Sequence, residues 1–555
     1  MRIRQGLAVA LATLTLGLAA CDGDDGATGA PGPQGPEGPG GPQGPGGSGE
    51  VLLDLSLIGR YASGVFDEGA AEIVAHDAST QRMFVINAAA ATVDVLNIAD
   101  PSEPVLLETI DASAEGAGAN SVAVFGGVAA VAIEADPKTD PGKVVFYDTT
   151  SLQKLGEATV GALPDMLTFT PDGNAVLVAN EGEPNEGYTV DPVGSVSIID
   201  VSEGFAAPTV APADFAAFNA QAAALRAAGV RIYGPGATVA QDLEPEYIGI
   251  AADGQSAWVA LQEANAIGVL DLSDLSAPVF TDILPLGYKD HRVLGNELDA
   301  SDRDGLINIR NWPVLGMYQP DAIASYSFNG KTYYITANEG DDRNDFIPDE
   351  ETVRIKDLTL DAEAFPDAVT LQADEAIGRL AATRFNGDTD DDGDFDALYV
   401  LGGRSFSIWS ADATQLYDSG ADFERITAQR YPANFNASND DNEAEDRSDA
   451  KGPEPEGLAV GTIAGRTFAF IGLERIGGIM VYDVTNPQNA RFVQYINPRD
   501  FSRTPGDDPD AGDLGPEGLA FIAAEDSPID VPMLVVGNEV SGTTAFLRVD
   551  VIELD

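Results

Sequence analysis

One short phrase recurs along this chain and constrains its fold more than any other feature. It reads Gly515-Pro516-Glu517-Gly518-Leu519-Ala520 near the C-terminus, and Glu454-Pro455-Glu456-Gly457-Leu458-Ala459 before that. Looser copies begin at Leu163, Glu244 and Gln319. Each copy places a proline and an acidic residue before an alternating apolar run, which is typical of a strand that begins after a turn. The recurrence favours a fold built from similar β units.

A second acidic residue follows each copy, roughly 16 to 22 residues later, at the end of another apolar run. Between Glu246 and Glu263 lie one strand, the turn Ala252-Asp253-Gly254-Gln255 and a returning strand, which together predict a β-hairpin. The start of the first strand and the end of the second lie side by side in a hairpin, so we expect both acids at one rim. The five predicted pairs are Asp165/Glu181, Glu246/Glu263, Asp321/Glu339, Glu456/Glu474 and Glu517/Glu539.

Repeat units of ~40–50 residues with up to four short strands predict an all-β fold, a single β-propeller of seven or eight four-stranded blades. The last unit supplies three strands, and the segment 53–61 would complete it and close the ring. A short helical insertion is predicted near 214–228, where Asp214 stands at the start and Gly229 follows the end. The candidate units begin near Glu72, Asn120, Asp165, Glu246, Asp321, Arg379, Glu456 and Glu517.

The chain is strongly acidic. Its 555 residues include 90 acidic and 30 basic side chains, for a formal net charge of −60, while 44% of the residues are hydrophobic. This composition indicates a globular protein with an acidic surface. The charge repels nucleic acid and anionic lipid, so we exclude nucleic acid as a partner and expect no direct membrane binding. A single cysteine excludes an internal disulfide.

The N-terminus predicts secretion and anchoring. Residues 1–20 have a basic start and an apolar stretch that ends at Cys21, which is typical of a bacterial lipoprotein signal peptide. We therefore expect a membrane-anchored protein of the cell envelope, facing the periplasm or the exterior and held only by a lipid at Cys21. The alternative is an ordinary signal peptide with a chance cysteine. Residues 21–50 form a collagen-like linker with glycine at every third position, favoured as an extended spacer over a trimerising segment. The propeller then occupies 51–555.

One acidic loop has the spacing of a calcium site. Carboxylates at alternate positions, with Gly393 at the sixth, match a Ca²⁺-binding loop, although Tyr399 stands where a bidentate Glu is expected. The alternative is a solvated acidic loop. The expected ligands are Asp388, Asp390, Asp392, Asp394 and Asp396.

The paired acids of the hairpins admit two interpretations. Acids at strand ends can simply cap turns or bind water. Like charges gathered in a narrow channel instead raise one another's pKa or bind metal, and we favour Ca²⁺ or a mixed metal site. No Gly-x-Ser-x-Gly element, Cys/His dyad or P-loop occurs, so serine-nucleophile and NTPase functions have no support.

Several longer stretches resemble the choice-of-anchor I family, over about residues 55–553. They are Arg60–Gly64, Leu298–Asp302, Ile307–Pro313, Gly402–Ser407 and Lys451–Gly457. The resemblance implies a β-propeller with variable surface attachment; some members carry the name of atypical alkaline phosphatases, others of mesenchyme-specific cell-surface glycoproteins. The Pro-Glu-Gly-Leu-Ala phrase also resembles phytase-like propellers, in which channel acids hold Ca²⁺ that binds phosphate.

Two functions follow as expectations. The first is a metal-dependent phosphomonoesterase, in which Ca²⁺ and a second catalytic metal, held by the paired acids, would bind a phosphomonoester and activate water. Arg404 and Arg475 would then be catalytic, stabilising the developing charge. The alternative is a non-enzymatic surface propeller that adheres to or binds extracellular partner proteins. The fold alone does not decide between these two functions.

Overall fold

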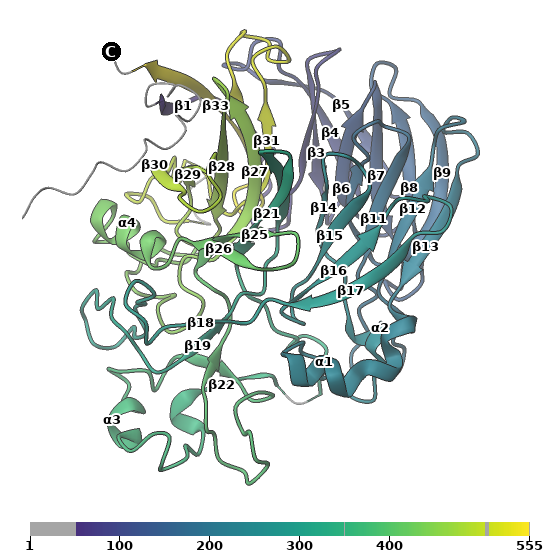
Figure 1. Ribbon diagram of the computed structural model, residues 1–555. Helices are drawn as coiled ribbons and strands as arrows, with labels where there is room; N and C mark the ends of the chain where they lie inside the picture. Colours follow the sequence, from purple (N-terminus) through teal and green to yellow (C-terminus); the bar gives the residue numbers. More distant parts are fainter. Residues whose placement is uncertain (1–50, 349, 506–509, 554–555) are drawn as a thin grey trace, which may run out of the picture. The chain divides into compact units, whose positions relative to one another are not determined.

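Seven four-stranded antiparallel sheets make up most of the computed structural model, which describes residues 51–348, 350–505 and 510–553 (Figure 1). We number these sheets as blades 1 to 7. The strands of the first three blades are β2 (Val74–Asp77), β3 (Arg82–Asn87), β4 (Thr92–Asn97) and β5 (Val105–Asp111); β6 (Gly118–Phe125), β7 (Val128–Glu134), β8 (Pro141–Asp148) and β9 (Lys154–Ala162); β10 (Pro164–Phe169), β11 (Ala175–Asn180), β12 (Ser195–Asp200) and β13 (Thr209–Asp214).

The remaining blades follow the same order, except that the strand closing blade 7 comes from the start of the described chain. Their strands are β14 (Ile248–Ile250), β15 (Ser256–Leu261), β16 (Ala266–Asp271) and β17 (Val279–Pro285); β20 (Ile323–Phe328), β21 (Lys331–Asn338), β25 (Ser405–Ser410) and β26 (Gln415–Asp418); β27 (Pro455–Ile463), β28 (Arg466–Leu473), β29 (Ile479–Asp483) and β30 (Arg491–Ile496); β31 (Pro516–Ile522), β32 (Met533–Asn538), β33 (Thr543–Glu553) and β1 (Val51–Ala62).

The blades form a closed ring, which confirms the predicted propeller. Their first strands contact one another in the order β2, β6, β10, β14, β20, β27, β31 and back to β2. In blade 7, β1 pairs with β33 from Val51↔Glu553 to Ala62↔Thr543, so the N-terminal segment completes the last blade as predicted. The separate unit predicted near Arg379 is wrong, because that segment belongs to an insertion between two strands of blade 5.

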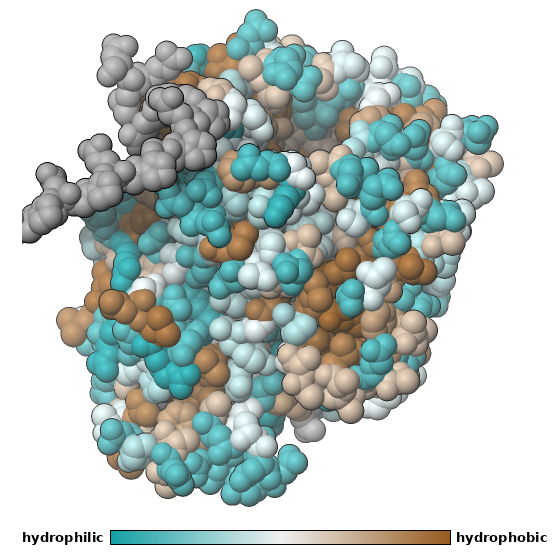
Figure 2. Space-filling model, in the orientation of Figure 1, coloured by the Kyte–Doolittle hydropathy of each residue, from teal (hydrophilic) through white to brown (hydrophobic). Residues whose placement is uncertain are grey.

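The core lies between neighbouring blades. The second strand of each blade is covered on both faces, so it is apolar without alternation; every residue of β11 is buried. One core cluster joins Leu177 and Ile198 of blade 3 to Val259 of blade 4. Outer strands such as β5 are mostly exposed. On the face drawn in Figure 2, hydrophilic residues dominate and a hydrophobic patch lies over β16 and β17.

Four insertions leave the repeat, and most of their elements gather at one end of the blades, the lower part of Figure 1. They contain the 3₁₀ helix η1 (Ala216–Gln221), α1 (Ala222–Ala228) and α2 (Val239–Asp242); β18 (Tyr288–Asp290) and β19 (Leu315–Met317); β22 (Thr352–Arg354), η2 (Ile355–Asp357), α3 (Ala368–Leu371), β23 (Ala381–Thr383) and β24 (Tyr399–Val400); and α4 (Asp422–Arg430). Residues from β18, β19 and β24 form one small sheet, and β22 pairs with β23.

The helical insertion predicted near 214–228 is confirmed and begins as a 3₁₀ turn. The Asp214 carboxylate accepts the Ala216 N–H at 2.9 Å. Gly229, at φ +105°, ends α1 in the left-handed conformation that favours glycine. Phe215, Phe218 and Leu225 are buried in the core between blades 3 and 4, which holds the insertion in place.

The predicted signal peptide 1–20, the predicted lipid at Cys21 and the predicted linker 21–50 lie outside the described residues. A compact unit spans Glu50–Asp555. Among the helices of the described ranges, none has the length and apolar character needed to cross a membrane.

Candidate metal centre

Seven equivalent positions, one per blade, surround the central channel at the start of the innermost strands. We call them the inner ring. In β10, β27 and β31 the pairing register shifts just after the proline, so a bulge follows each Pro-acid pair. A bulge re-aims the side chain next to it. Six of the positions carry a carboxylate and one an amide: Glu72, Asn120, Asp165, Glu246, Asp321, Glu456 and Glu517.

A second set of acids, the rim acids, ends the second strand of six blades. In blades 6 and 7 the backbone of this acid pairs with the residue two positions before the inner ring: the N–H of Glu474 donates to the Glu454 carbonyl at 2.9 Å, and that of Glu539 to the Gly515 carbonyl at 2.8 Å. Carboxylate oxygens lie within 4.8 Å of each other in two of the predicted pairs, Asp321/Glu339 and Glu456/Glu474. The rim acids are Glu134, Glu181, Glu263, Glu339, Glu474 and Glu539.

Sequence reasoning missed two acids of these sets, Glu72 and Glu134. Glu72 has no proline before it, because the chain reads Ala71-Glu72-Ile73, and Glu134 has only an asparagine, Asn120, as its hairpin partner. An alignment of the predicted unit starts would have found Glu72, since Glu72 begins the first unit.

Many of the channel carboxyls are buried among like charges, and this raises their pKa values. Burial raises the pKa of Glu72 to about 8, and the charges of Asp165 and Glu539 add to the effect. Burial likewise raises the pKa of Asp165 to about 7. The pKa is raised well above the ordinary value, first by burial and then by neighbouring carboxylates, at Glu181, Glu246, Asp321, Glu456, Glu474 and Glu517.

Several of these buried oxygens lack a partner. The Oε2 atoms of Glu72, Glu246, Glu456 and Glu517 are shielded from solvent and accept no hydrogen bond from the described residues. A buried carboxylate oxygen without a partner is costly unless a proton or a cation compensates for it. The arrangement therefore suits a cation at the inner ring.

Carboxylate oxygens in the channel also come close enough to share an ion. Three overlapping groups each place one oxygen per residue within 4.8 Å of the others: Asp321/Glu339/Glu456, Glu456/Glu474/Glu539 and Glu339/Glu454/Glu474. A cavity of about 40 Å³ lies at the inner ring, between Asp165, Asp321 and Glu517. A water-sized particle needs about 10–15 Å³, so this cavity has room for one.

Basic residues reach the rim acids of blades 5 and 6. The Lys451 ammonium lies 2.5 Å from Glu339 and 3.0 Å from Glu454, and Arg475 lies 2.7 Å from Glu474 and 3.0 Å from Glu454. Sequence reasoning predicted Arg475 but missed Lys451 and Glu454, although Glu454 begins a copy of the phrase and Lys451 lies shortly before it. A cavity of about 390 Å³ opens beside Glu474, Arg475 and Glu539.

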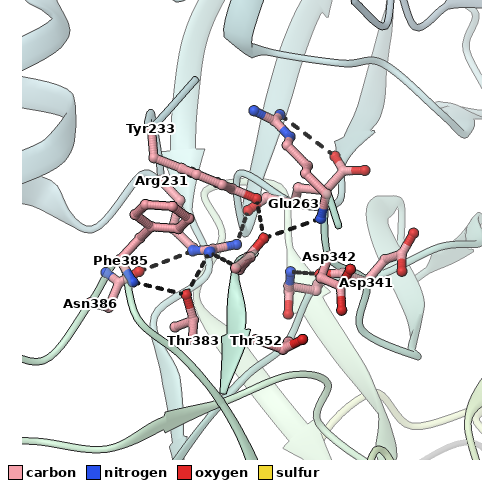
Figure 3. Close-up of polar contacts among 12 residues, drawn as sticks. Arg231, Tyr233, Glu263, Asp341, Asp342, Thr352, Thr383, Phe385 and Asn386 are labelled. Atoms are coloured by element: carbon pink, nitrogen blue, oxygen red, sulfur yellow. Dashed lines mark hydrogen bonds and ion pairs between the residues drawn. The ribbon is translucent and has the colours of Figure 1, made fainter. Parts of the chain in front are cut away.

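At blade 4, a buried polar cluster fastens the longest insertion to the rim (Figure 3). The Arg231 guanidinium lies between Tyr233, Asn386 and Thr383 and donates to the Glu263 carbonyl at 2.6 Å. Glu351, which directly precedes β22, forms a buried ion pair with Arg231 and accepts the Tyr233 hydroxyl at 2.6 Å.

Arg343 continues this cluster toward the channel. Its guanidinium lies 2.5 Å from Asp242, 3.0 Å from Glu244 and 3.9 Å from the rim acid Glu263. Burial alone would lower the pKa of Arg343, but Glu244, Tyr233 and Asp242 outweigh it, so the pKa is raised and the charge is retained. Sequence reasoning missed Arg231 and Arg343 because their partners are far away in the chain.

Arg404, predicted to stabilise developing charge in catalysis, instead contacts a buried carboxylate and backbone carbonyls. Its guanidinium pairs with Glu424 at 2.6 Å and donates to the carbonyls of Asp299, Ser448 and Ala450. These contacts hold the 436–454 segment and α4 together, and no contact supports the predicted catalytic role.

The predicted calcium loop folds with some of its carboxylates together. Oxygens of Asp388, Asp390 and Asp396 lie within 4.8 Å of one another, and a second group joins Asp394 and Asp396 to Asp361. Asp392 is in neither group; its carboxylate accepts the N–H of Asp394. Asp361 was missed because it comes from a preceding loop, brought close by the bridge Leu360↔Phe395. The loop belongs to the insertion of blade 5.

Comparisons with known proteins identify sequence relatives of this chain. The family model of the choice-of-anchor I domain matches residues 72–487. Gigasin-3a of Magallana gigas is 32% identical over 191 residues, which are 32% of this chain and 67% of that protein. The mesenchyme-specific cell surface glycoprotein of Strongylocentrotus purpuratus is 28% identical over 246 residues, which are 38% of this chain; the match spans only 31% of that relative.

Among solved structures, hydrazine synthase of Kuenenia stuttgartiensis has a TM-score of 0.42 and 12% identity, over 89% of this chain and 99% of that chain. The β-propeller domain of a Myceliophteria thermophila protein has a TM-score of 0.41 and 8% identity, over 89% and 99%.

Proposed function

Because the chain belongs to the choice-of-anchor I family, we propose that it is a surface-exposed binding propeller whose central channel holds divalent cations, with Ca²⁺ as the first candidate. One observation carries the cation: buried carboxylate oxygens of the inner ring, at Glu72, Glu246, Glu456 and Glu517, have no partner among the described residues. The similarity to a cell surface glycoprotein supports the surface location.

The donor set favours a hard cation. Ca²⁺ takes six to eight oxygen ligands in flexible geometry, and the channel offers carboxylates with no cysteine. Only two histidines occur in the chain, and the buried ring of His291 is bound to the Asn296 carbonyl. A cation in the ring would compensate for the burial of these carboxyls, the main cause of their raised pKa values, and would also relieve the repulsion between them.

Calcium titration of the full chain tests this proposal. We expect Glu456→Gln and Glu517→Gln to weaken Ca²⁺ binding measured by isothermal titration calorimetry by roughly tenfold or more, about 1.4 kcal/mol. Glutamine keeps the volume and one acceptor oxygen but lacks the charge. Glu203→Gln is the control, because Glu203 is exposed on a loop outside the channel. Unchanged affinity and stoichiometry in both channel variants would overturn the proposal.

In this proposal a lipid at Cys21 anchors the protein in the bacterial cell envelope and residues 22–50 act as a spacer. The partners are then extracellular or surface proteins, and the spacer would let the propeller bind them away from the membrane. Trimerisation through the Gly-x-y segment is the less favoured arrangement.

A second candidate function is metal-dependent hydrolysis of phosphomonoesters. It is favoured by Arg475, which borders the cavity of about 390 Å³ beside two rim acids. Its Nη2 atom forms no hydrogen bond with the described residues, whereas Nε and Nη1 bind Glu454 and Asn439. A guanidinium held in this way can bind a phosphoryl oxygen next to a metal ion.

An assay of the purified full chain with a chromogenic phosphomonoester, with Ca²⁺ or Mg²⁺ and then with chelator, tests this second function. We expect Arg475→Ala to lower turnover while Ca²⁺ content changes little. Arg466→Ala is the control, because Arg466 pairs with Asp483 inside blade 6. Absence of metal-dependent hydrolysis by the wild type would overturn the enzymatic function and leave the binding propeller.

A further inference from the structure

The three sets of channel carboxylates share residues, but they differ in how many lysine or arginine side chains pair with them. We name them group A (Asp321, Glu339, Glu456), group B (Glu339, Glu454, Glu474) and group C (Glu456, Glu474, Glu539). Group B shares Glu339 with group A and Glu474 with group C. An ion bound in one group therefore draws on the ligands of another.

Group B already contains cations of the protein itself. Lys451 lies 2.5 Å from Glu339 and 3.0 Å from Glu454, and Arg475 pairs with Glu454 and Glu474. Arg447 adds a third contact to Glu454, at 2.6 Å. Burial would raise the pKa of Glu454, but these three cations outweigh burial and hold the pKa below its usual range.

Groups A and C contain residues with no such compensation. Within the described ranges, Asp321, Glu456 and Glu539 form no ion pair with any lysine or arginine, and the Oε2 atom of Glu456 has no hydrogen-bond partner. The channel therefore carries paired lysine and arginine side chains on one side, whereas Asp321, Glu456 and Glu539 have none among the described residues.

We propose that Lys451 is a built-in counter-ion that takes the place of a metal ion in group B, so that the channel binds divalent cations only through groups A and C. This inference rests on the proposed function. The Lys451 ammonium is a compact point charge, and it donates to Glu339 and the Gly340 carbonyl while it pairs with Glu454. Two hydrogen bonds and one ion pair thus fix the position of the ammonium between Glu339 and Glu454.

The consequence is that removing this charge creates a further metal site. In Lys451→Met the apolar stem is retained, but Glu339 and Glu454 lose their shared cation and a divalent ion can replace it. In Lys451→Arg the positive charge remains. Lysine therefore sets the number of ions that the channel holds.

The test is the Ca²⁺ content of the full chain at saturation, measured by equilibrium dialysis with elemental analysis. We expect Lys451→Met to bind one more Ca²⁺ per chain than the wild type, and Lys451→Arg to match the wild type. Lys138→Met is the control, because Lys138 pairs with Glu183 and is half exposed. Near-UV circular dichroism, with and without Ca²⁺, reports whether each variant is folded.

The outcomes separate this inference from the function on which it rests. The inference is supported if Lys451→Met needs Ca²⁺ to fold and then binds one more ion than the wild type. Unchanged ion content in the folded variant overturns it, and so does a variant that stays unfolded at saturating Ca²⁺. Wild-type binding that is insensitive to Glu456→Gln and Glu517→Gln overturns the proposed channel site instead.

Discussion

Replacement of Arg343 by methionine should destabilise the fold strongly, because this residue compensates two buried carboxylates. Arg343 is 1% exposed, and its partners Asp242 and Glu244 are 0% and 2% exposed. Methionine fills much of the same volume but leaves both carboxylates without a cation. Breaking a buried ion pair by removing one partner costs about 3–5 kcal/mol. We therefore expect Arg343→Met to lower the free energy of unfolding by that amount at pH 7.

Urea denaturation of the full chain, followed by tryptophan fluorescence, measures this change. The matched control is Arg292→Met, since Arg292 pairs with Asp290 but its side chain is 63% exposed. Exposed pairs contribute about 0–1 kcal/mol, so the control should be close to the wild type. If Arg343→Met loses less than about 1 kcal/mol, the reasoning that this arginine fastens the insertion to the channel rim is refuted.

Three further perturbations test other parts of the account. Ca²⁺ at 100 times its dissociation constant should stabilise the 388–396 loop by about 2.7 kcal/mol; Asp396→Asn should abolish the corresponding rise in melting temperature, whereas Asp391→Asn should not. Burial lowers the pKa of His291 to about 3. As the pH falls below about 6.5, His291 takes up a proton in the unfolded chain but not in the folded one. This difference lowers the free energy of unfolding by roughly 2.7 kcal/mol at pH 4.5. Urea denaturation should show that the free energy of unfolding falls less between pH 7 and pH 4.5 in His291→Gln than in the wild type, by that amount. An equal fall in both proteins would contradict this expectation. Cys21→Ser should move the protein from the membrane fraction to the soluble fraction, and a variant that stays membrane-bound would refute the lipid anchor.

The repeated hairpin could be predicted from sequence because its signals are local. A proline and an acid before an alternating run, followed by a turn and a returning apolar run, determine strand, turn and register within about 20 residues. Hence the pairing of Glu456 with Glu474 and of Glu517 with Glu539 follows from spacing alone. The closing strand β1 was also predictable, because the last unit supplied only three strands.

What the sequence could not show depends on contacts between distant segments. Lys451 and Glu339 are far apart in the chain, and so are Arg343 and Asp242, yet these pairs decide which carboxylates are compensated. The segment after Arg379 reads as strands because β23 and β24 have strand-like composition, but it lies in an insertion and not in an eighth blade. Arg404 resembles a catalytic residue in sequence, and only its buried partners show a structural role.

Crystals of the full chain grown with Ca²⁺ or a lanthanide substitute would show where ions bind. The account predicts anomalous scattering peaks inside the channel, with the oxygens of Asp321, Glu339 and Glu456 at about 2.3–2.6 Å from one ion. Peaks confined to the 388–396 loop, with the carboxylates of the inner ring bound only to water, would contradict it.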